Sequence, residues 1–181
     1  MRNTRLLVAS CFLSLVLTCP AQVELGVYGA AVPLQSSNGN LAAQTGLGGG
    51  AAFRYRFLGQ FRLGLNAAVY DYTPAAPAPT YRIYPLEALA EWAPKLGYAV
   101  EPYLNASLGY YQTQLETSAP EGGSATTQTR SDIGLGGGVG VYLPVAKGLF
   151  VDLSARYLYL PAEEGPQTLL PLHLGLVYRF E

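Results

Sequence analysis

The chain has 181 residues, a length that fits one domain. Charged residues make up only 13% of it, whereas about a quarter is usual in soluble proteins. The sequence pI is near 5.8. Such a balance excludes the basic surface that nucleic-acid binding requires, so no nucleic-acid partner is expected.

The beginning of the chain has the composition of a secretory signal peptide. Arg2 and Arg5 supply the positive start, and the apolar run that follows spans 6–17. This run is too short for a transmembrane anchor. We therefore expect residues 1–21 to be cleaved and residues 22–181 to form the mature domain.

Both cysteines of the chain, Cys11 and Cys19, lie in this leader. The mature chain therefore has no disulfide and no thiol chemistry. Acylation of Cys19 would make the protein a lipoprotein, but Val16 and Thr18 fit that signal poorly. With one histidine and no mature cysteine, we expect no metal site and no cofactor.

Apolar residues alternate with polar or small residues throughout the mature chain. A period of two is typical of a β-strand with two unlike faces, and no part of the mature chain shows a convincing helical period. Every second residue from Leu170 to Phe180 is Leu, Tyr or Phe. We expect eight strands, at about 23–32, 45–57, 61–72, 81–92, 98–111, 131–143, 149–160 and 169–180.

The breaks between these segments alternate in length. Those after the first, third, fifth and seventh segments are long and polar, and the others are short turns. This alternation is typical of an up-and-down barrel with short periplasmic turns and longer external loops. An even number of strands places both termini in the periplasm. The longest break, about 112–130, contains Glu116 and Glu121 and is the loop best suited to an extracellular ligand.

The position of the charges separates a membrane barrel from a soluble one. The apolar faces contain almost no ionisable residue, and only Arg82 and Glu101 are left unassigned. A charge at the lipid midplane costs about 2–4 kcal/mol, so we expect the charged faces to point inward. Those faces carry five acids and five bases: Glu24, Arg54, Arg56, Arg62, Glu87, Glu91, Asp132, Asp152, Arg156 and Arg179. The predicted fold is all-β, an eight-stranded antiparallel up-and-down transmembrane β-barrel.

The ten charged side chains are expected to pair across the lumen. An eight-stranded barrel has room for side chains but scarcely for a channel, and an unpaired buried charge is costly. Near the short turns we expect a salt-bridged plug formed by Arg54, Arg56, Arg62, Glu91, Asp152 and Arg179. Inward glycines of the second and sixth segments predict a cavity above this plug. A narrow pore or a conduit for small hydrophobic ligands is therefore the alternative function.

Aromatic residues gather where the two membrane boundaries are expected. Near the short turns they are Phe57, Phe61, Trp92, Tyr178 and Phe180. Near the loops they are Tyr81, Tyr84, Tyr110, Tyr157 and Tyr159. Two such belts argue against the core of a soluble β-sandwich.

The end of the chain carries a specific pattern: a polar residue, a glycine and two spaced aromatics, at His173, Gly175, Tyr178 and Phe180. It resembles the C-terminal insertion signal of the small outer-membrane barrels of Gram-negative bacteria, the OmpA-like, OmpX-like and opacity-type group. The resemblance covers the whole mature chain. It implies recognition by the barrel-assembly machinery. We also expect a monomer with outer-membrane lipid and lipopolysaccharide as its partners. Glu181 departs from the pattern, since the signal usually ends on the aromatic.

His173 is the only histidine and the only candidate base for catalysis. Barrels that modify lipid A need a histidine beside a serine or an acid. Ser154 could reach His173 across strands, although the sequence does not show it. We therefore expect no catalytic residue and a non-enzymatic integral outer-membrane protein, with envelope and surface roles served by its external loops. A lipid A-modifying enzyme is the remaining alternative.

Overall fold

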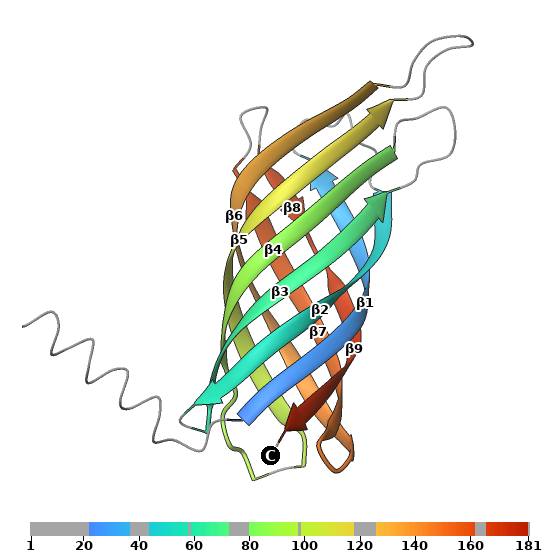
Figure 1. The fold of residues 1–181 in the computed structure, drawn as a ribbon. Coiled ribbons are helices and arrows are strands. Elements are labelled where there is room, and N and C mark those ends of the chain that lie inside the picture. The colour runs from blue at the N-terminus through green and yellow to red at the C-terminus, as the bar shows by residue number, and fades with distance from the viewer. Residues whose placement is uncertain are drawn as a thin grey trace, which may run out of the picture.

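The computed structural model describes residues 22–36, 44–57, 59–72, 80–97, 99–117, 126–161 and 166–180. The elements in these ranges are β1 (Gln22–Ser36), β2 (Gln44–Phe57), β3 (Phe61–Tyr72), β4 (Thr80–Trp92), β5 (Glu101–Thr117), β6 (Thr126–Ala146), β7 (Leu149–Leu160), β8 (Gln167–Leu169) and β9 (Leu172–Phe180). Each strand is antiparallel to its neighbours, and β1 pairs with β2 on one side and with β8 and β9 on the other. The sheet thus closes into a barrel (Figure 1). The described residues contain no helix long and apolar enough to cross a membrane.

The last two strands occupy one position in the wall. Both β8 and β9 pair with β7 and with β1, and Pro171 lies between them. Proline has no backbone N–H to give to the ladder, so the strand is interrupted there. The Pro171 carbonyl still accepts a hydrogen bond from Arg156 N at 3.0 Å. The predicted eight-stranded antiparallel up-and-down barrel is confirmed, with its eighth strand divided in two.

The register of the strands fixes the width of the barrel. Paired residues followed once around the wall from Phe57 are Phe61, Trp92, Leu104, Val139, Ala155, Leu172, Ala31 and Leu47. The path returns to β2 ten residues from its start, at position 47 instead of 57. With eight strands, this stagger corresponds to a tilt of about 40° and a backbone radius of about 8 Å. Such an interior is wide enough for side chains alone.

The β5–β6 hairpin is longer than the sequence predicted. The sequence predicts a loop at about 112–130, but residues 112–117 and 126–130 continue the ladder from Gln112↔Ser131 to Thr117↔Thr126. This stretch is rich in Thr and contains no proline, a composition that favours strands despite its polarity. The hairpin rises above the other strands in Figure 1. Glu121 lies outside the described residues, as does the whole leader, 1–21.

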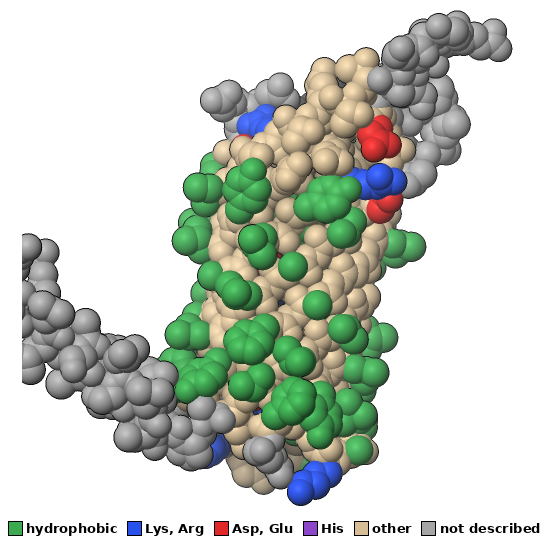
Figure 2. All heavy atoms as spheres, viewed as in Figure 1, with side chains coloured by type: hydrophobic (Ala, Val, Ile, Leu, Met, Phe, Trp, Pro, Cys, Tyr) green, Lys and Arg blue, Asp and Glu red, His purple; other side chains and the backbone are tan. Residues whose placement is uncertain are grey.

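The outer wall is apolar and the interior is charged. Large side chains such as Leu47, Ile133 and Leu174 are 69%, 66% and 61% exposed. In Figure 2 hydrophobic side chains cover the visible wall, and charged ones lie at its two ends. Glu24 and Glu87, by contrast, are fully buried. This inside-out pattern is that of a wall surrounded by lipid.

Candidate functional site in the barrel lumen

A cluster of five ionic residues fills the lumen at the end with the short turns. We call it the mouth cluster; it consists of Glu24, Arg56, Arg62, Glu101 and Arg179. Glu24 pairs with the three arginines at 2.8–3.2 Å, and Glu101 pairs with the same three at 2.7–3.0 Å. Three guanidinium groups thus share two carboxylates, so this layer holds one excess positive charge.

Glu101, which the sequence left unassigned, is a central member of the mouth cluster. It pairs across the ladder with Tyr142, which is fully buried in the lumen. Cross-strand partners share a face, so Glu101 points inward with Tyr142. The signal was available in the sequence, because Glu101 has the same parity along the strand as the inward Tyr103.

A second ionic layer, the middle cluster, consists of Arg54, Glu91 and Asp152. Arg54 Nε lies 2.9 Å from Glu91 Oε1, and Arg54 Nη2 lies 3.2 Å from Asp152 Oδ2. Tyr142 donates to Glu91 at 3.0 Å, and Tyr103 donates to Asp152 at 2.7 Å. The two carboxylates share Arg54, and Glu91 also lies 4.0 Å from Arg62 Nη1, so the excess negative charge of this layer balances the mouth cluster.

Further along the lumen, Arg156 and Glu87 form a bidentate pair, with both N–O distances 2.8 Å. Glu87 also accepts hydrogen bonds from Asn66, Ser107 and Tyr111 at 2.7–3.2 Å. Bidentate arginine–carboxylate pairs are among the strongest charge-assisted hydrogen bonds. Glu87 is fully buried, and no local pattern in the sequence predicts its three neutral donors.

One of the ten predicted lumen charges lies apart from the others. Asp132 pairs with Arg130, two residues away on the same strand, at 2.9 Å. Both lie near the loop end of β6, where the wall gives way to the hairpin. Arg82 is also at this end, 3.0 Å from Asp71 and 3.6 Å from Glu116.

The half of the lumen near the loops is filled by a cluster of tyrosine and aliphatic side chains, which we call the upper cluster. Its members are Ala30, Val32, Ala68, Tyr70, Tyr72, Tyr81, Ile83, Tyr111, Leu158, Leu160 and Leu169. Tyr81 was expected in the outer aromatic belt but is 9% exposed and packs edge-on against Tyr72. Tyr81 lies on the same face of β4 as the buried Glu87 and Glu91, and this explains why it points inward.

The predicted cavity beside the inward glycines is wrong, because aromatic rings occupy it. A Cβ atom added to Gly46 would lie 2.6 Å from the Tyr72 ring, and one added to Gly134 would lie 2.8 Å from the Tyr111 ring. The glycines therefore give tyrosines of neighbouring strands their space. A small cavity of about 20 Å³ remains between the middle cluster and the Arg156 pair. This is room for about one water molecule.

His173 meets Ser154 across β7 and β9, at 3.4 Å between Nδ1 and Oγ. Its Nε2 faces the Tyr70 hydroxyl at 3.3 Å, and its ring is tilted by 32° to the Tyr28 ring, with centroids 4.4 Å apart. A nucleophile and its base need a hydrogen bond of about 2.6–3.2 Å and a third group that orients the base. Both ring nitrogens of His173 face neutral hydroxyl groups inside a filled lumen. This arrangement fits a packing role better than a catalytic one. No group of three or more metal-ligating side chains occurs in the described ranges.

The four residues of the expected assembly signal divide between the two faces of β9. His173 and Gly175 point inward, whereas Tyr178 and Phe180 are 47% and 46% exposed. The two aromatic rings meet edge-on with centroids 4.8 Å apart. They lie at the end with the short turns, as do the outward rings of Phe61 and Trp92.

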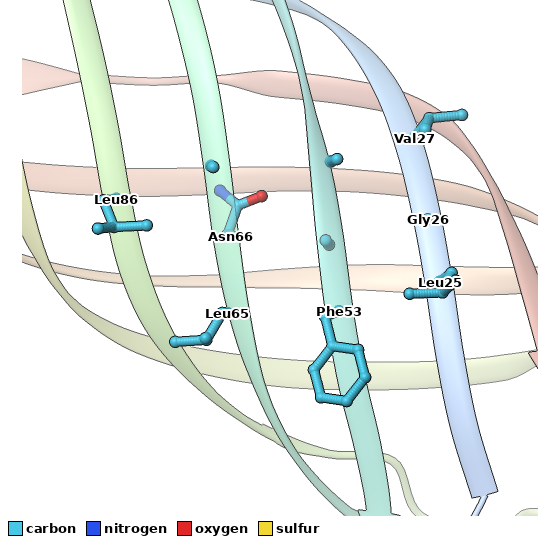
Figure 3. A pocket seen from close by; sticks show the side chains of 10 residues that line it. Leu25, Gly26, Val27, Phe53, Leu65, Asn66 and Leu86 are labelled. Atoms are coloured by element: carbon cyan, nitrogen blue, oxygen red, sulfur yellow. The ribbon is translucent and has the colours of Figure 1, made fainter.

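The outer wall carries a hollow of about 370 Å³, shown in Figure 3. Ala51 and Ala67 form its floor because they pair with each other between larger side chains. The rim includes Leu25, Phe53 and Leu86. No outward polar group marks this hollow as a specific site.

Comparisons with known proteins agree with this architecture. Residues 9–180 match the family described as the outer membrane protein beta-barrel domain. Neisserial surface protein A has a TM-score of 0.74 at 22% identity, covering 87% of this chain and 97% of that one. The attachment invasion locus protein Ail of Yersinia pestis has 0.64 at 16%, covering 88% and 99%. OprG of Pseudomonas aeruginosa has 0.63 at 15%, covering 89% and 96%. No curated protein sequence matches the chain.

Proposed function

This chain belongs to the outer membrane protein β-barrel family, and from that premise we propose that it is a non-enzymatic envelope protein that makes surface contacts through its β5–β6 hairpin. Family membership implies the Gram-negative outer membrane. Residues 1–21 are the cleaved signal and 22–181 the barrel. Both termini face the periplasm, and the hairpin is extracellular.

The observation that carries this proposal is the length and pairing of β6. Its 21 residues span about 53 Å along the barrel axis at the tilt derived above, against a hydrocarbon thickness of about 30 Å. Pairing with β7 begins at Leu135, whereas residues 126–129 pair only with β5 among the described strands. These four side chains are polar and exposed. An exposed sheet edge outside the membrane can accept an extended peptide as an added strand.

The charge of this end favours a peptide over a polyanion. Arg82 and Arg130 face Asp71, Glu116 and Asp132, so these groups leave no positive excess. The Yersinia pestis barrel has been solved with the heparin analogue sucrose octasulfate. For the present chain we infer instead that backbone pairing provides the affinity and that the ligand is an extended polypeptide.

We also propose that the barrel is a closed monomer, held in lipid and lipopolysaccharide by its apolar wall. Insertion uses the assembly machinery, which reads His173, Gly175, Tyr178 and Phe180. Support for closure comes from the ionic layers and the upper cluster, which lie in series along the lumen. Planar-bilayer recording of the purified protein should show no steady conductance. A stable open level would overturn closure and favour the pore alternative.

The surface role is tested with cells that display the protein and an array of extended peptides. Gln128→Pro places a residue without a backbone N–H in the exposed stretch 126–129 and should abolish peptide capture. Gln128→Ala keeps the backbone and is the matched control, so its capture should equal that of the wild type. Equal capture by all three proteins, or by a chain whose hairpin is cut back to residues 111 and 132, would contradict the proposal.

A further inference from the structure

A pocket of about 310 Å³ opens at the end of the barrel that carries the short turns. It lies between the β2–β3 turn and the segment that joins β4 to β5, and a hydrogen bond of 2.8 Å from Ala93 N to Gln60 O ties these two segments together. Its lining includes Arg56, Gly59, Lys95, Leu96, Val100 and Glu101. We call it the turn-side pocket.

The turn-side pocket is positively charged. Its charged lining residues are Arg56, Lys95 and Glu101, so two cationic groups face one carboxylate. Lys95 Nζ lies over Gly59, 3.0 Å from where a Cβ of that residue would be. Arg56 uses Nη2 for both of its ion pairs, and its Nε is buried without a hydrogen-bond partner. An anion between Arg56 and Lys95 would offset the net positive charge of this lining.

The rim of the pocket is apolar. Leu96 and Val100 are 53% and 39% exposed, and Trp92, on the outer wall at the end of β4, is 41% exposed. A free anion gains nothing from such a rim, whereas an amphiphile places its charged group on the basic residues and its chains on the apolar ones. Aromatic residues such as Trp92 mark the height at which lipid headgroups lie.

We propose that the turn-side pocket binds the phosphate group of an anionic phospholipid in the adjoining leaflet. The phosphate lies between Arg56 and Lys95, and the acyl chains follow Leu96 and Val100 toward the outer wall. This inference goes beyond the surface role of the hairpin and depends only on the placement of the barrel in a membrane. It gives the lower end of the barrel a defined lipid partner.

Trp92 supplies the test, because it is the only tryptophan of the chain and directly precedes Ala93, which lines the pocket. The protein is reconstituted in vesicles that contain brominated phosphatidylglycerol or brominated phosphatidylcholine, and quenching of Trp92 fluorescence reports which lipid is adjacent. We expect phosphatidylglycerol to be preferred about fivefold or more at low salt. Lys95→Gln should reduce this preference about two- to fivefold, and Arg56→Gln should reduce it further.

The matched control is Lys147→Gln, which removes a lysine from the β6–β7 turn at the same end and should leave the preference unchanged. If Arg56→Gln does not fold, the comparison of Lys95→Gln with Lys147→Gln still tests whether the pocket sets the lipid preference. Equal quenching by both lipids in the wild type would overturn the proposal. If inorganic phosphate abolished the difference in quenching between the two lipids, the pocket would be assigned to free phosphate and the phospholipid assignment would be overturned. Absence of quenching by either lipid would contradict membrane placement itself.

Discussion

The two halves of the lumen are stabilised by different kinds of interaction, ion pairs in one and apolar packing in the other. Near the short turns, the mouth and middle clusters join four arginines to four carboxylates. Near the loops, the upper cluster fills the same cross-section with tyrosine rings and aliphatic side chains. Ionic layers require complete partners, because one missing group leaves a buried charge. Apolar layers require only that their volume be filled, so the loss of stability after a truncation grows with the volume of the cavity that it creates.

The largest expected effect is that of Glu87→Ala. It would leave the Arg156 guanidinium buried without a carboxylate, a change that typically costs about 3–5 kcal/mol. Denaturant unfolding of the reconstituted barrel measures the loss. The double variant Glu87→Met with Arg156→Met removes the pair together and should recover most of the stability. If the double variant were no more stable than Glu87→Ala, stranded charge would not be the cause.

Leu158→Ala tests the apolar half at a fully buried position. The expected loss is about 2–4 kcal/mol, because the rigid wall cannot collapse onto the cavity. The same unfolding measurement applies. Leu158→Met, which nearly conserves volume, is the control and should cost less than about 1.5 kcal/mol. A loss of equal size in both variants would show that volume does not govern this layer.

Glu101→Gln should have a smaller effect on the ionic half. Its side chain is 28% exposed at the mouth, so water can replace part of what its three arginines lose. We expect a loss of about 1–2 kcal/mol. This loss of stability should be smaller in high salt, because exposed charges are screened there. A loss as large as that of Glu87→Ala would contradict the distinction between buried and mouth carboxylates.

Ser154→Ala should have the smallest effect. Its 3.4 Å contact with His173 is long, and neutral substitutions of this kind usually change stability by less than about 0.5 kcal/mol. Lipid A extracted from cells that express either protein should also be identical by mass spectrometry. A difference in lipid A that depends on Ser154 would support the enzyme alternative and contradict the packing role.

The sequence predicts which face of a strand a residue occupies better than it predicts which residues it contacts. Alternation puts Glu24, Glu87 and Arg156 on the charged faces of their strands, and the cost of a charge in lipid points those faces inward. Which charges meet depends on the ten-residue stagger of the closed barrel, which no local pattern contains. For the same reason, the inward glycines suggested an empty space. The rings that fill it come from neighbouring strands, such as Tyr72 against Gly46.

The seam between β1 and β9 has a consequence for the time course of folding. Its pairs run from Val23↔Phe180 to Ala31↔Leu172, so they join residues 141–157 positions apart in the chain. Contacts at such separations form late, because the whole intervening chain must first be brought into register. The barrel therefore cannot close until its final strand has arrived. The seam is where we expect the rate-limiting step of insertion.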